Sequence, residues 1–277
     1  MSNDTEPYQE VYQVIRSQLD EAGHQVHRLY AEGLSAGVLN DARLVVVVGV
    51  RAAELVSALP GRSPVLAVLV PRTWFLRHGR ARLFDSGRRV VSAVFLDQPF
   101  ERQARLVRIA FPDARRVGVL LSADQRGIVD ELDEALRAQR LGLTHQVVEE
   151  DERLLTPLEQ VLGESDVLLA IPDPLVFNRS TAQSLFLTSY RYREPVVGYS
   201  RSMTRAGALV SLYSTPAQIG RQAGEWIVGA LSGGMARLPA PGYPAYFEVS
   251  INDQVARSLG YTLPTEAELE RRLGGVR

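Results

Sequence analysis

The chain has 277 residues, enough for one large α/β domain or for two domains of ordinary size. It carries 31 basic residues, all of them Arg, against 32 acidic ones, and this near-neutrality argues against a nucleic-acid-binding protein. Cysteine is absent, which excludes disulfides, thiol catalysis and a Cys-ligated metal. No apolar run approaches the roughly 20 residues of a membrane-spanning helix, so we expect a protein that does not span a membrane.

The first third of the chain has the pattern of a βαβ unit. We expect a first helix, capped by Asp4 or Thr5, that runs to about residue 19. Unbroken apolar runs at 43–50 and 65–70 are typical of strands that are covered on both faces of a parallel sheet. A short helix is expected between these two strands, and Gly49 allows the backbone to turn into it.

A second α/β pattern begins after a seam near residues 90–100. The strand expected near 90–96 precedes the second pattern, which predicts strands near 116–121 and 144–148 with helices between them. The stretch 166–215 continues it as strand, helix, strand, short helix, strand, with Asn178 as a helix N-cap. Strands that alternate with helices predict parallel sheets, and the fold class is therefore α/β with two Rossmann-like halves.

Three segments have the capping-box spacing, in which a Ser or Thr is followed three residues later by Gln or Glu. They are 122–125, 156–159 and 215–218, and each is expected to open a helix. After the third helix we expect a strand at 246–251 and a small helix at 253–259. Thr265 is expected to cap a charged tail that is exposed to solvent.

The strand ends in the stretch 166–215 carry polar and aromatic side chains. Asp173 follows one expected strand, Tyr199 and Ser200 follow the next, and Tyr213 follows a third. Ligands on parallel α/β sheets bind beyond the carboxyl ends of the strands. The sequence therefore predicts a ligand site at this edge.

The sequence offers no pattern for catalysis or for a cofactor. The four His residues are scattered; His24 and His27 are three residues apart and could share a helix face, but no Asp or Glu lies at a ligand-like spacing with a second His. There is no G-x-S-x-G elbow, Walker loop or G-x-G-x-x-G. We predict that the protein is not an enzyme and binds no metal or cofactor, and that Asp173 orients a ligand.

The segment from Ile171 to Leu231 resembles the ABC-transporter substrate-binding proteins of the tryptophan/tyrosine-importer type. The similarity is carried by Pro172-Asp173, Pro195-Val196 with Gly198, and Ala206-Gly207-Ala208-Leu209, and then by Gly220-Arg221-Gln222-Ala223 and Ile251-Asn252. Val48-Gly49-Val50 and Arg116-Val117-Gly118-Val119-Leu120 also look like family positions. The resemblance keeps its order over nearly the whole chain.

The resemblance implies the type 1 periplasmic-binding-protein fold, with ligand held in a cleft between two lobes that close by a hinge motion. We place lobe one at 1–95 plus 215–244, and lobe two at 96–214 plus 245–277. The expected ligand-binding residues are Asn3, Tyr8, Gly49, Arg51, Arg72, Ser122, Gln125, Asp173, Asn178, Tyr199, Ser200 and Tyr213. Arg51 or Arg72 would face an anionic group. The alternatives are that these arginines are surface residues, that Ser122 and Gln125 only cap a helix, and that the tyrosines only pack.

The chain departs from the family pattern at two places. Where members that bind aromatic amino acids usually carry Asn-Ser, this chain has Gly127-Ile128. The expected ligand is therefore an amino-acid-like, aromatic or small anionic molecule. The family also begins with a signal peptide and a hydrophobic strand, and the given chain shows neither, so we expect that Met1 is an internal start or that the first strand is missing.

The function implied by the resemblance is that of the solute-binding component of an ABC importer. Its expected location is the periplasm, and its expected partners are a small-molecule ligand and an ABC permease. The alternative is a ligand sensor of the same fold that acts on a signalling partner, since both functions need the same cleft.

Overall fold

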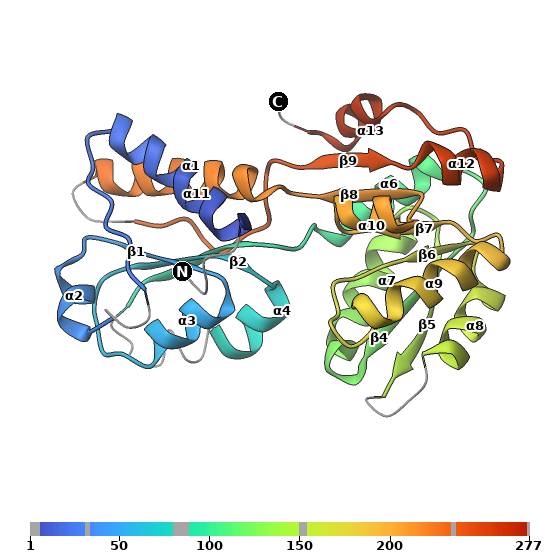
Figure 1. Cartoon of the computed structure of the whole chain (residues 1–277), viewed down its shortest axis with the longest axis horizontal. Helices are drawn as coiled ribbons and strands as arrows, with labels where there is room; N and C mark the ends of the chain where they lie inside the picture. The colour runs from blue at the N-terminus through green and yellow to red at the C-terminus, as the bar shows by residue number, and fades with distance from the viewer. Residues whose placement is uncertain (1–5, 31–33, 80–88, 150–153, 234–236, 276–277) are drawn as a thin grey trace. The chain divides into compact units, whose positions relative to one another are not determined.

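The computed structural model describes residues 6–30, 34–79, 89–149, 154–233 and 237–275. The chain forms two compact units, and it passes between them three times (Figure 1). Unit 1 consists of Met1–Asp97 and Ser214–Tyr246, and unit 2 of Gln98–Tyr213 and Phe247–Arg277. Each unit combines a mainly parallel sheet with helices, which confirms the predicted α/β fold class.

Unit 1 is built on a three-stranded parallel sheet in the order β1-β2-β3. All six residues of β2 are buried, as its unbroken apolar sequence predicts. The elements of this unit are α1 Glu6–Glu21, α2 Ala36–Asp41, β1 Val45–Val48, α3 Val50–Ser57, β2 Val65–Val70, α4 Arg72–Trp74, η2 Phe75–Gly79, β3 Val91–Phe95 and α11 Pro216–Ser232.

Helices α1 and α11 lie side by side although about 200 residues separate them in the sequence (Figure 1). Two glycines of α11 allow this close approach. A Cβ atom at Gly220 would come within 3.2 Å of the backbone carbonyl of Val11, and one at Gly224 would collide with the side chain of Gln18. Buried apolar residues of both helices, among them Ile15 and Ile219, join the same core cluster.

Unit 2 has a six-stranded sheet in the order β5-β4-β6-β7-β8-β9, in which only β9 is antiparallel to its neighbour. The sequence predicted β9 as a strand but not its direction. The elements are α6 Phe100–Ala110, β4 Arg116–Ser122, η3 Ala123–Ile128, α7 Val129–Ala138, β5 Gly142–Val148, α8 Leu155–Glu164, β6 Val167–Leu169, α9 Arg179–Arg191, β7 Val196–Gly198, α10 Arg201–Ala206, β8 Val210–Tyr213, β9 Glu248–Ile251, α12 Asp253–Leu259 and α13 Glu266–Leu273.

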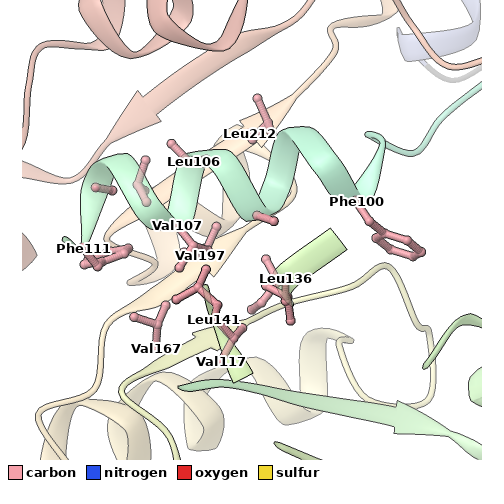
Figure 2. Packing of buried hydrophobic residues seen from close by; sticks show 14 of the residues in the cluster. Phe100, Leu106, Val107, Phe111, Val117, Leu136, Leu141, Val167, Val197 and Leu212 are labelled. Carbon is pink, nitrogen blue, oxygen red and sulfur yellow. The ribbon is translucent and has the colours of Figure 1, made fainter. Parts of the chain in front are cut away.

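The larger core of unit 2 forms where α6 covers one face of the sheet (Figure 2). Leu106 and Val107 of α6 are fully buried, and they share one cluster with the strand residues Val117, Val167 and Val197. Burial on this scale stabilises a domain by roughly 1.5–3 kcal/mol for each large apolar side chain. This core holds β4, β6 and β7 in place, and their carboxyl ends carry the predicted ligand residues.

Of the three predicted capping boxes, one forms. Thr215 and Gln218 cap α11 reciprocally, with Pro216 in the first turn. The box at 122–125 was wrong, because the side chain of Ser122 makes no cap hydrogen bond and a 3-10 helix follows it. The box at 156–159 was also wrong, since α8 begins at Leu155 and Thr156 therefore lies inside the helix and not at its N-cap.

The expectation of a solvent-exposed C-terminal tail was also wrong. Thr265 does cap α13, since its side chain accepts a hydrogen bond from the N–H of Glu268. Leu269 and Leu273 of this helix are buried in the main core of unit 2. Glu266 and Glu270 accept backbone N–H groups of β9, and Glu268 pairs with Arg271 and Arg272, so α13 is an amphipathic helix and part of the fold.

The contact between α1 and α11 gives a first prediction. Gly220→Leu places a side chain against the backbone of Val11, and overpacking of this kind costs about 1–3 kcal/mol. We expect the free energy of unfolding of unit 1 to fall by this amount in urea denaturation. Both tryptophans, Trp74 and Trp226, belong to unit 1, so their fluorescence follows it.

The matched control is Gly229→Ala in the same helix. No atom lies within 4 Å of the Cβ position at Gly229. This substitution should stabilise α11 by about 0.5–1 kcal/mol, because alanine loses less conformational freedom than glycine. Equal effects of the two substitutions would contradict the close packing at Gly220.

Candidate functional site

Asp173 organises the carboxyl-end edge of the sheet in unit 2. Its carboxylate is buried, with the residue 3% exposed. One oxygen accepts the backbone N–H of Ser122 at 2.8 Å, and the other accepts that of Leu175 at 3.0 Å. Asp173 thus fastens the loop after β6 to the end of the neighbouring strand β4.

Tyr199 follows β7 at the same edge. Burial raises the pKa of its phenol, and the negative charge of Asp173 raises it further. The phenol therefore stays protonated over the physiological range and can donate a hydrogen bond. Its ring packs edge-on against Phe177, with ring centroids 6.0 Å apart.

Gln125 lies in η3, directly after β4. Its side-chain oxygen is buried, and within the described part of the chain it has no hydrogen-bond partner. A buried amide oxygen without a donor is costly, by about 1–3 kcal/mol, unless another molecule supplies the donor. Ser122, Gln125, Asp173 and Tyr199 thus all belong to the ends of β4, β6 and β7, which are adjacent in the sheet.

Two of the predicted residues use their side chains to begin helices. Asn178 caps α9, with its oxygen accepting the N–H groups of Ser180 and Thr181. Its amide also donates to two backbone carbonyls, so its hydrogen-bonding capacity is largely spent. Ser200 caps α10 by accepting the N–H of Met203.

Tyr213 ends β8, next to β7 in the sheet. Its hydroxyl accepts a hydrogen bond from Arg201 Nε at 3.0 Å and lies 3.4 Å from a carboxylate oxygen of Glu248. Burial raises the pKa of this phenol. The sequence interpretation missed Glu248, although the alternating pattern of β9 could have placed it opposite Tyr213, with which it is paired in register.

Unit 1 repeats the arrangement found at Asp173. Asp97 follows β3, and its carboxylate accepts the backbone N–H of Arg72, at the end of β2, at 2.6 Å. Burial raises the pKa of Asp97. Sequence reasoning missed this residue, although an aspartate directly after a buried strand was a usable signal.

The other residues predicted in unit 1 are spread over three elements. The Arg72 guanidinium lies over the ring of Tyr243, 5.7 Å from its centroid. Gly49 ends β1 with a φ of 85°, which favours glycine, and Arg51 is exposed in the first turn of α3. Tyr8 lies on α1 and packs against the core cluster of α1 and α11. Asn3 lies outside the described residues.

Two negative findings apply to the described ranges alone. Within them, no three His, Asp or Glu side chains are grouped so that they could hold a metal ion. No helix among those residues is long and apolar enough to cross a bilayer.

Two α/β units with polar and aromatic side chains at the carboxyl ends of parallel strands are the architecture of ligand-binding proteins with two lobes. A family model described as "ABC transporter substrate binding protein" matches residues 38–269. The chain therefore belongs to this family, whose members bind substrates and do not catalyse. The sequence search among curated proteins gave no match.

Solved structures agree on the fold. The ABC domain from Streptococcus pneumoniae in complex with L-Trp is 18% identical, with a TM-score of 0.64, and the alignment covers 98% of this chain and 96% of that one. The ligand-free, open structure of CD0873, a substrate-binding protein with adhesive properties from Clostridium difficile, is 16% identical, with a TM-score of 0.74 over 95% and 93% of the two chains.

A third similar structure is the complex of the TorS sensor domain with TorT in the presence of TMAO. It is 13% identical, with a TM-score of 0.50 over 93% and 92% of the two chains. Together with the family match, these likenesses confirm the resemblance to substrate-binding proteins with the type 1 periplasmic-binding-protein fold. At such low identity they show the fold alone.

The role of Asp173 can be tested by its removal. Asp173→Ala leaves the buried N–H of Ser122 without an acceptor, and we expect the free energy of unfolding of unit 2 to fall by about 1–3 kcal/mol. Urea denaturation followed by circular dichroism measures this. Asp113→Ala, at an exposed position, is the control and should change stability by less than about 0.5 kcal/mol. If Asp173→Ala leaves the free energy of unfolding unchanged, the hydrogen bond does not hold this edge.

Proposed function

We propose that the protein is the solute-binding component of an ABC importer and captures a small molecule that is amino-acid-like, aromatic or a small anion. The observation that carries this proposal is the set of hydrogen-bonding groups at the strand ends of unit 2. The buried oxygen of Gln125 lacks a donor, and the phenol of Tyr199 remains a donor beside Asp173. A ligand with both donor and acceptor groups would pair with them.

The two units would act as the two lobes of the binding protein. Our proposed boundaries are 1–95 plus 215–244 for lobe one and 96–214 plus 245–277 for lobe two. The ligand would lie in a cleft between the lobes, and a hinge motion would close it. The chain passes between the units three times, and a hinge motion would need to bend only these three segments, which supports the proposal.

The proposed contacts differ in whether their side chains already cap a helix. Ser122, Gln125, Asp173 and Tyr199 would contact the ligand directly from unit 2. Asn178 and Ser200, which cap helices, would contribute mainly by placing the adjacent backbone. The remaining predicted contacts are Asn3, Tyr8, Gly49, Arg51, Arg72 and Tyr213, with Arg51 or Arg72 facing an anionic group.

A sensor of the same fold is the second candidate. The observation that favours it is the similarity to the complex of the TorS sensor domain with TorT. A permease and an ATPase encoded beside this protein would support import, and a kinase or cyclase would support sensing. A periplasmic location follows from the proposed import function and is part of the proposal.

Native mass spectrometry of gently purified protein tests ligand capture. We expect one small molecule per chain, which can then be extracted and identified. A protein that is empty, and that no member of a metabolite library stabilises against heat, would contradict the proposal.

Tyr199→Phe tests the site once a ligand is identified. The substitution keeps the ring against Phe177 and removes the phenol, so we expect the Kd to rise about tenfold, the effect of one lost hydrogen bond. Isothermal titration calorimetry measures the change. Tyr190→Phe is the matched control, because Tyr190 is 52% exposed on α9. If both variants bind like the unmodified protein, Tyr199 is not part of the site.

A further inference from the structure

Glu194 is a buried acid that the ligand site does not use. It lies in the turn between α9 and β7, at the amino-end edge of the sheet, and is 4% exposed. Within the described ranges no basic side chain forms an ion pair with it, and one of its carboxyl oxygens is buried without a hydrogen-bond partner. A carboxylate left in this condition would be strongly destabilising.

The hydrogen bonds around Ser165 indicate where a proton lies. Ser165 Oγ is 2.7 Å from the backbone carbonyl of Val161 and 2.6 Å from the other carboxyl oxygen of Glu194. A hydroxyl has one hydrogen and cannot donate to both acceptors. Both short contacts become hydrogen bonds when Ser165 donates to Val161 and a protonated Glu194 donates to Ser165.

The surroundings of this pair are crowded and carry negative charge. A Cβ atom at Gly118 of β4 would collide with Ser165 Oγ, so Ser165 has little room to turn away. Burial raises the pKa of Glu194 to about 8, with a smaller rise from the charge of Asp166. The other titratable or charged groups on the packed elements include the half-buried Tyr261 and the exposed residues Asp113, Arg115, Arg116, Glu164 and Arg193.

We propose that Glu194 is a proton-binding site that holds unit 2 together as a neutral carboxylic acid, and that its ionisation in mildly alkaline solution loosens the sheet. The ionised group would oppose Asp166, which accepts the N–H groups of Arg115 and Arg116 at the start of β4. It would also stand directly before β7, where Pro195 O accepts a hydrogen bond from the N–H of Leu168 in the neighbouring strand β6. Three adjacent strands thus begin beside this acid.

The sign of the pH dependence follows from the raised pKa. In the unfolded chain Glu194 loses its proton near 4.5, and in the folded protein near 8. The folded state therefore binds the proton more tightly, and the stability that it contributes is lost as the pH rises toward 8. This is the reverse of an ordinary ion-paired carboxylate.

The test is a comparison of thermal unfolding at pH 6 and pH 9. The Tm of the unmodified protein should fall by roughly 5–10 °C more than that of Glu194→Gln, whose amide keeps a donor toward Ser165 but does not titrate. Carbon-13 NMR of labelled Glu side chains can follow the titration, and the Glu194 signal is assigned by its absence from the spectrum of Glu194→Gln. This signal should titrate with a midpoint near 8. Equal pH dependence in the two proteins, or a midpoint near 4.5, would overturn the proposal.

Two further variants separate a titrating site from a merely structural one. Ser165→Ala removes the oxygen that accepts the proton of the neutral acid, and it should move the midpoint to lower pH. Asp166→Asn removes a negative charge and should move the midpoint to lower pH. A midpoint that neither variant moves would overturn the assignment to Glu194. These measurements need no ligand, so they stand apart from the proposed function.

Discussion

The carboxylate of Asp173, which accepts the backbone N–H of Ser122, is the contact on which the candidate site depends. Parallel strands end in loops whose N–H groups have lost their partners in the sheet, and buried N–H groups must be paired. In each unit an aspartate after one strand supplies the acceptor for the neighbouring segment, the buried Asp173 in unit 2 and the half-buried Asp97 in unit 1. The edge that carries Gln125 and Tyr199 is thereby fixed.

The two edges of the sheet in unit 2 show how the hydrogen-bond partners of a buried acid determine its role. Asp173 receives two backbone N–H groups, which can only donate and so suit a carboxylate. Glu194 meets a hydroxyl that is already close to a carbonyl, which suits a neutral acid. The strands that carry the proposed ligand contacts at one end thus begin beside Glu194, the group whose charge we propose to depend on pH.

The sequence predicted strands well where a run of apolar residues is unbroken. The runs at 65–70 and 116–121 are buried strands because only a covered parallel strand accommodates apolar side chains on both faces. It did not predict which distant elements meet. The pairing of α1 with α11 depends on Gly220 and Gly224, and a glycine inside a helix reveals neither its partner nor the close approach.

The local sequence by itself determined the fold class, most strands and helices, and the set of residues at the strand ends. The tertiary structure alone decided what those residues do. Thr215 and Ser122 share one capping pattern, but only Thr215 forms the box; the N–H of Ser122, which the Gln125 side chain would accept in a box, is bonded to an aspartate 51 residues away. Capping energies of about 1 kcal/mol are small, and burial and long-range hydrogen bonds outweigh them.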